Sequence, residues 1–138
     1  MKLIYPAIFT PFDDNGQIGY VVVFPDLPGC STGGATIQEA LEMAADAASG
    51  WIITSIEDGK TLPAASSIQN IKPEEDGAFV NLVQLDIDAY AKLYSNKAVK
   101  KTLTLPQWLN TIAEREGVNF SGILQNALIE HLHIQDKN

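Results

Sequence analysis

The sequence predicts an α+β protein in two parts: an antiparallel sheet with one main helix, then a small module of one strand and two helices. Two strand-forming runs, 3–10 and 18–24, flank an Asn-Gly step that favours the tight reversal of a β-hairpin. Apolar residues recur at helical spacing after residue 36. A polar and apolar alternation over 99–105 changes to helical spacing at Pro106.

The elements of the first part follow in order along the chain. The two hairpin strands should pair antiparallel, and a third short strand is expected at 30–32. Thr36 and Glu39 form a capping box that begins a helix. Its buried side is expected to comprise Ala40, Leu41, Ala44, Ala47, Ala48, Trp51 and Ile52. A loop at 57–67, a strand at 77–86 that returns to the sheet, and a short helix at 89–93 complete this part.

The second part reads as strand, helix, helix. Pro106 suits a first helical turn, Gly117 a helix C-terminus and Asn119 the cap of a second helix. The apolar positions of the two helices are Trp108, Leu109, Ile112, Ala113, Ile123, Leu124, Ala127, Leu128 and Leu132. One strand and two short helices cannot bury these residues alone, so two copies should intertwine with their strands paired across a two-fold axis.

Charge is divided between the two parts at the Ser95-Asn96-Lys97 linker. The whole chain of 138 residues carries −8. Residues 1–96 hold 4 lysines and no arginine against 13 carboxylates, a net of −9, whereas 97–138 carry 5 basic and 4 acidic residues, a net of +1. An acidic body would attract a basic protein, while the second part keeps positive charge for a phosphate backbone. A chance division in a mildly acidic protein is the alternative.

Other features restrict the class of protein. No apolar run is long enough for a membrane span, and a signal-peptide cleavage site is missing, so we expect a cytoplasmic protein without membrane contact. The single cysteine, Cys30, cannot form an internal disulfide, which fits a reducing compartment. His131 and His133 lie two apart, on different helix faces, so no metal site is expected there. No cofactor-binding motif is present.

Two motifs resemble known families. The pattern Lys-x-Thr-x-Thr-Leu-Pro over 100–106, with Gly117 to Ser121, resembles the ribbon-helix-helix repressors of bacteria. Tyr5-Pro6-Ala7, the stretch 19–30 and the stretch 36–42 resemble the HicB family of antitoxins. The resemblance implies a reduced RNase H-like domain at 1–96 that blocks a small basic mRNA-cleaving toxin, HicA. It also implies a ribbon-helix-helix domain at 97–138 that dimerises, binds operator DNA and represses the shared operon, and it leaves open whether dimers associate further.

The expected DNA contacts lie in the second part. Lys100, Thr102 and Thr104 correspond to the base-reading positions, and paired antiparallel strands fit the major groove, where lysine can donate to guanine and threonine can meet thymine. Lys97 adds positive charge. Backbone amides around Asn119, Phe120 and Ser121 would hold a phosphate at the helix start. An ordinary amphipathic edge strand with solvated lysine and threonine is the alternative.

The expected contacts with a basic toxin are the carboxylates Asp26, Glu39, Glu42 and Asp46. A plain solvated helix face explains the last three equally simply. A metal-dependent RNase H-like nuclease is disfavoured, because such a site needs carboxylates that converge on two metal ions, and here they are scattered over a turn, a loop and one helix. The other rival is a free-standing repressor whose first domain senses a ligand or only oligomerises.

Overall fold

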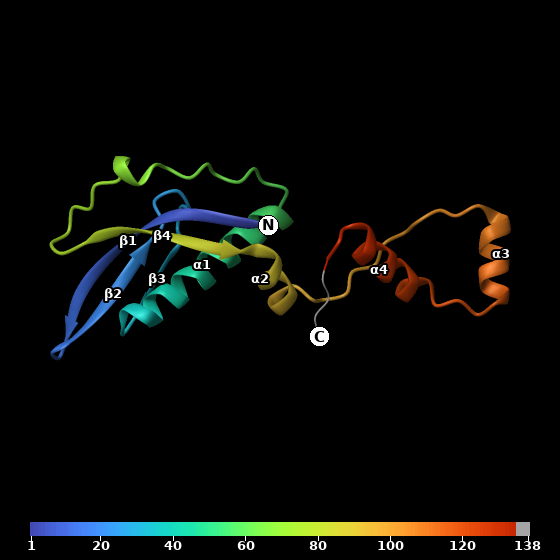
Figure 1. The fold of residues 1–138 in the computed structure, drawn as a ribbon, viewed down its shortest axis with the longest axis horizontal. Helices are drawn as coiled ribbons and strands as arrows, with labels where there is room; N and C mark the ends of the chain where they lie inside the picture. Colours follow the sequence, from blue (N-terminus) through green and yellow to red (C-terminus); the bar gives the residue numbers. More distant parts are fainter. Residues whose placement is uncertain (135–138) are drawn as a thin grey trace. The chain divides into compact units, whose positions relative to one another are not determined.

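The computed structural model describes residues 1–134 and divides the chain into two compact units, Met1–Lys97 and a second that begins at Ala98. The division falls one residue after the linker position expected from the sequence. The first unit is a four-stranded antiparallel sheet in the order β3-β2-β1-β4 (Figure 1). Its strands are β1 (Lys2–Asp14), β2 (Gln17–Val23), β3 (Ser31–Gly34) and β4 (Phe79–Asp86).

The predicted hairpin and returning strand are confirmed. β1 pairs antiparallel with β2 from Ile8↔Val23 to Asp14↔Gln17, and with β4 along its other edge. Asn15 and Gly16 turn the chain with φ values of 53° and 88°, the positive region that this dipeptide tolerates best. The Gly16 N–H also donates to the carboxylate of Asp13 at 2.8 Å.

The core lies between one face of the sheet and the helix α1 (Ile37–Glu57). Alternate residues of β1 point into it, and their partners on β2 and β4 point the same way. The buried side chains from the sheet are Tyr5, Ala7, Phe9, Val22, Val83 and Leu85. Those from α1 are Ala40, Ala44, Ala48 and Ile52. Alanines let the helix lie close: a Cβ on Gly34 would be 2.4 Å from the Ala40 nitrogen.

Helix α1 begins as predicted, since Thr36 Oγ1 accepts from the Glu39 N–H at 3.1 Å. One expected core position is wrong. Leu41 is 37% exposed, because the side of α1 that faces the sheet is the stripe of Ala40, Ala44, Ala48 and Ile52, and Leu41 lies about 100° around the helix from Ala40. Ser49 and Ser55 are buried along α1 instead.

A long connection, 58–78, joins α1 to β4 and contains one short 3-10 helix, η1 (Ile68–Asn70). In Figure 1 this connection runs above the strands, whereas α1 starts below them and crosses the view obliquely. Hydrogen bonds help to hold it in place: Tyr5 Oη donates to the Pro63 carbonyl at 2.6 Å, and Ser66 donates to Asp26 from its N–H and its hydroxyl. The short helix α2 (Ile87–Tyr94) follows β4, with Asp86 as its cap.

The second unit contains two helices, α3 (Gln107–Arg115) and α4 (Phe120–His131). Both were predicted, although Pro106 occupies the cap position of α3, one residue before the first turn. Gly117 ends α3 with a φ of 68°, and Asn119 caps α4 by accepting from the Gly122 N–H at 3.1 Å. Neither helix has a buried residue in the single chain.

The strand expected at 99–105 is not formed in the single chain. Residues 95–106 belong to no helix or strand. A strand is defined by backbone hydrogen bonds to a neighbour, and one chain offers this segment no neighbouring strand. The ribbon of the expected ribbon-helix-helix domain therefore stays a prediction that concerns two chains.

Candidate functional site

The residues expected to read DNA are exposed. Lys97, Lys100, Thr102 and Thr104 all lie in the segment without regular structure that precedes α3. Their side chains are free to meet another molecule, but the single chain holds them in no defined arrangement. The geometry needed to test base reading thus requires a second strand beside this one.

The start of α4 is the other expected DNA contact. Asn119, Phe120 and Ser121 are exposed, and Phe120 begins the helix. The side chain of Asn119 already accepts the Gly122 N–H, so it serves as the helix cap. The remaining amides of the first turn point outward with the positive end of the helix dipole, which is the arrangement that favours an anion.

An apolar surface covers both helices of the second unit. Six large side chains of α3 and α4 are 40–66% exposed: Trp108, Leu109, Ile112, Phe120, Ile123 and Leu128. Soluble domains rarely leave so many large apolar side chains on two adjacent helices in water unless a partner covers them. This surface includes most of the positions that the helical pattern assigned to a shared core.

The expected toxin contacts divide into two kinds. Glu39, Glu42 and Asp46 are exposed on α1, as a solvated helix face predicts. Asp26 is half-buried, and its carboxylate accepts two hydrogen bonds from Ser66, at 2.8 Å and 2.5 Å. The structure therefore gives Asp26 a visible task within the fold, holding the connection 58–78, and leaves the other three free.

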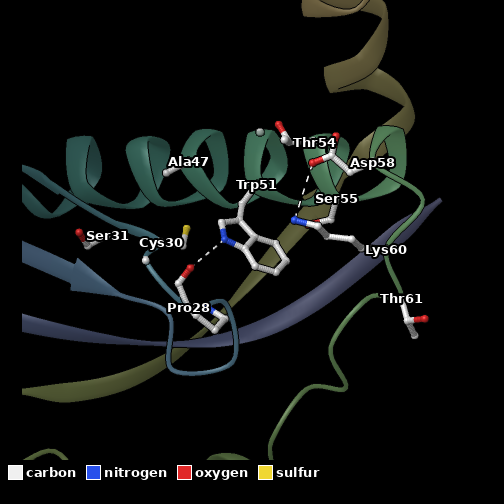
Figure 2. Close-up of a pocket in the computed structure, with 12 residues that line it drawn as sticks. Pro28, Cys30, Ser31, Ala47, Trp51, Thr54, Ser55, Asp58, Lys60 and Thr61 are labelled. Carbon is white, nitrogen blue, oxygen red and sulfur yellow. Dashed lines mark hydrogen bonds and ion pairs between the residues drawn. The ribbon is translucent and has the colours of Figure 1, made fainter.

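A pocket of about 530 Å³ lies between α1 and the segment that leads into β3 (Figure 2). Trp51 forms one wall and donates from Nε1 to the Pro28 carbonyl at 3.0 Å. Lys60 and Asp58 form an ion pair at 3.8 Å. The buried Cys30 also lines the pocket, and burial raises the pKa of its thiol, which keeps it protonated and a poor nucleophile.

The sequence analysis missed a second apolar surface, on the sheet face away from α1. The register places five exposed side chains on this face: Ile4, Phe12, Val21, Val23 and Leu82. Pro6 points to the same face and is fully buried, so part of the face is covered. The signal was present in Tyr20 to Phe24, which are apolar at every position; a sheet with one watery face alternates instead.

Some chemistries find no support in residues 1–134. Within that range, no group of three or more histidine, cysteine, aspartate or glutamate residues is placed to hold a metal ion. None of the helices described is both long and apolar enough to cross a membrane.

Comparison with known proteins identifies the relatives of this chain. The family described as "HicB_like antitoxin of bacterial toxin-antitoxin system" matches residues 5–127. A 14.9 kDa protein from the rep-hol intergenic region of Haemophilus phage HP1 is 33% identical over 109 residues, 78% of this chain and 76% of the phage protein. Antitoxin HicB 2 of Photorhabdus laumondii is 38% identical over 63 residues, which span 46% of this chain and only 42% of that antitoxin.

Among solved structures, one described as a toxin-antitoxin complex from Streptococcus pneumoniae contains a similar chain. It has a TM-score of 0.59 and 31% sequence identity, and the match covers 95% of this chain and 99% of the other. The similarity therefore extends over both units of the chain rather than over the sheet unit alone.

Proposed function

The chain belongs to the HicB-like antitoxin family of bacterial toxin-antitoxin systems, a non-enzymatic family, and we propose that it neutralises a small basic toxin and represses its own operon. The first unit, which we take to be a reduced RNase H-like domain, binds and inhibits a HicA-like mRNA-cleaving toxin. The second unit forms a ribbon-helix-helix dimer that binds operator DNA. The match of the antitoxin family over 5–127 is the observation that carries this proposal.

Toxin binding by the first unit is supported by charge and by the relatives. The similar Streptococcus pneumoniae chain comes from a toxin-antitoxin complex. Residues 1–96 carry a net charge of −9. A toxin that cleaves mRNA must bind phosphates with a basic surface, so an acidic protein that covers this surface gains attraction and a fast association rate.

Dimerisation by the second unit is supported by what its helices leave exposed. α3 and α4 bury none of their residues in the single chain, although their apolar positions repeat at helical spacing. The exposed segment before α3 has no strand partner. A second copy would supply both the missing core and the missing strand, because pairing across a two-fold axis places each apolar face against its equivalent.

Operator binding follows from the same dimer. In an antiparallel ribbon Leu103 and Leu105 face the shared core, so Lys100, Thr102 and Thr104 face outward together. Two such strands fit the major groove, and the amides at the start of α4 would anchor the neighbouring phosphate. Phosphate contacts fix the position of the protein, and base contacts supply the specificity.

Separated fragments test the division of work. We expect residues 1–96 to bind and inhibit the product of the adjacent toxin gene without binding the operator. Residues 97–138 should dimerise and bind DNA weakly without rescuing growth. Growth rescue beside the induced toxin, paired with operator gel shifts, measures both activities. If 1–96 is folded by circular dichroism yet does not bind the toxin, a ligand-sensing repressor replaces the antitoxin reading, with the pocket beside Trp51 as its site.

A further inference from the structure

The hairpin of the first unit extends beyond the rest of the sheet. β4 pairs with β1 only as far as Phe9, and β3 pairs with β2 only from Tyr20 onward. Residues 12–14 and 17–19 pair with each other alone. They form a projecting two-stranded ribbon, here called the arm.

Apolar side chains lie on both faces of the arm. Phe12 is 43% exposed, and its ring lies over Gly19, where an added Cβ would be 2.5 Å from a ring carbon. Ile18 is 49% exposed and points to the other face. Phe79, at the start of β4, stacks on Phe9 yet stays 40% exposed beside the base of the arm. Neither β3 nor β4 extends far enough to pair beside Phe12 or Ile18.

The same end of the sheet is acidic. Asp13 and Asp14 stand at the tip of the arm. The turn that contains Glu74, Glu75 and Asp76 leads to Gly77, whose Cβ position is 3.1 Å from the Pro11 ring, and Figure 1 shows this turn and the hairpin turn at one end of the unit. α1 begins there too, directly after β3, with Glu39 and Glu42 in its first turns.

Positive charge is nearly absent from this end. Of the lysines in the first unit, only Lys72 lies in or next to these segments. Lys2 pairs with the far end of β4, Lys60 follows the C-terminus of α1, and Lys92 is on α2. The unit is therefore polarised along its sheet, with an apolar and acidic end at the arm and the lysines elsewhere.

We propose that the arm end, defined as the arm, the 74–79 segment and the first turns of α1, is the surface that docks the basic toxin. This inference rests on the proposed antitoxin function and locates it. Ile18 and Phe79, which point to the same face of the sheet, supply the apolar centre of the interface, and the carboxylates around them supply the charged rim. That distribution is typical of protein interfaces, where a desolvated apolar centre gives affinity and rim charges speed the encounter.

Charge selects the toxin over a second copy of this chain as the occupant. Two arm ends brought together would oppose carboxylates with carboxylates, which is destabilising. A surface that binds RNA phosphates carries the opposite charge and would be attracted instead. The acidic residues named from the sequence are thereby reduced to Glu39 and Glu42, because Asp26 is engaged with Ser66 and Asp46 lies further along α1, near Tyr90.

A matched pair of charge variants in the full chain tests the location. One variant neutralises four arm-end carboxylates by Asp13→Asn, Asp14→Asn, Glu74→Gln and Glu75→Gln. The control removes the same charge elsewhere by Glu57→Gln, Glu114→Gln, Glu116→Gln and Glu130→Gln. Binding is measured with a catalytically inactive form of the adjacent gene's product. We expect the arm-end variant to associate about tenfold more slowly or worse at low salt, a gap that closes at high salt, and the control to match the natural chain.

A second pair tests the apolar centre. Ile18→Ser should speed dissociation of the toxin several-fold, whereas Leu93→Ser, at an α2 side chain that is 71% exposed, should not. Circular dichroism confirms that each variant is folded. If the natural chain fails to bind the toxin, the proposed function falls. If it binds and the arm-end variants bind equally well, or change only the self-association of the chain, the function stands and the docking surface lies elsewhere.

Discussion

The two units differ in what they bury. The first packs fourteen apolar side chains into one core, nine of them with no exposed surface at all. In the second, α3 and α4 bury none of their residues, although apolar residues recur at helical spacing in both. The difference teaches that helical patterning indicates which face will be covered, and not whether the same chain covers it. The core of the first unit is complete within one chain, whereas the second unit needs a second copy to cover its apolar side chains.

Leu103 gives the strongest test of the proposal that the second unit completes its core only in a dimer. It is 54% exposed in the single chain, but we place it in the shared core of the dimer. Leu103→Ala should cost about 2–5 kcal/mol at each of the two equivalent sites, enough to dissociate the dimer at micromolar concentration. Sedimentation equilibrium measures the dissociation constant. Thr102→Ala, on the opposite side of the strand, is the control that should stay dimeric; a Leu103→Ala dimer of unchanged stability would contradict the intertwined core.

Phe9 tests the opposite case, a core complete within one chain. Its side chain is fully buried and stacks on Phe79 at 5.4 Å between ring centroids. Phe9→Ala should lower the free energy of unfolding of the first unit by about 3–5 kcal/mol and leave dimerisation unchanged. Urea unfolding followed by Trp51 fluorescence, in a Trp108→Phe background, reports this unit alone. Leu82→Ala, at a half-exposed site on the sheet face away from α1, should lower the free energy of unfolding far less. Equal losses for the two variants would mean that this outer face is also covered.

The outward face of the ribbon should affect DNA affinity without affecting either core. We expect Lys100→Ala, Thr102→Ala and Thr104→Ala each to weaken operator binding by about 1–3 kcal/mol. Gel shifts at two salt concentrations measure the loss and its salt dependence. Lys60→Ala removes the same charge from the first unit and should leave operator affinity unchanged. Operator binding that is equal for all four proteins would remove the ribbon from the DNA interface.

Alkaline pH should destabilise the first unit, and not the second, through the ionisation of Tyr5. Burial, and then the charge of Asp26, raise its pKa above the usual value of 10.0, and its hydroxyl donates to Pro63. The unfolded chain therefore releases this proton at lower pH than the folded chain, so this contribution to stability is constant below pH 10 and is lost above it. Tyr5→Phe should cost about 0.5–1.5 kcal/mol at neutral pH and reduce the alkaline loss.

Chemical unfolding of the first unit between pH 8 and 11 provides the measurement. Tyr90 is replaced by Phe in the natural background and in the Tyr5→Phe variant, because burial also raises the pKa of Tyr90 and would add a second alkaline effect. All four tyrosines lie before residue 98, so dimerisation of the second unit serves as the internal control. An unchanged alkaline loss in Tyr5→Phe would assign the effect to another group.

Local chemistry made several elements predictable. The Asn15-Gly16 turn, the Thr36 cap and the Asn119 cap each depend on residues within three positions of one another, and the structure contains all three. Leu41 and Asp26 could not be placed in the same way. The exposure of Leu41 depends on which side of α1 the sheet covers, and the task of Asp26 depends on Ser66, 40 residues away. A periodic pattern reveals neither which side of a helix the sheet covers nor which distant residue a carboxylate contacts.

The sequence by itself determined the order of the elements, the split in charge at the linker and the family motifs, because these are properties of neighbouring residues. Only the tertiary structure decided how far each strand of the hairpin is paired, and hence that residues 12–19 project as an arm. It also brought the arm tip, the 74–77 turn and the start of α1 to one end. The physical reason is that strand register and the return of β4 fix which distant carboxylates become neighbours, and no local preference encodes that choice.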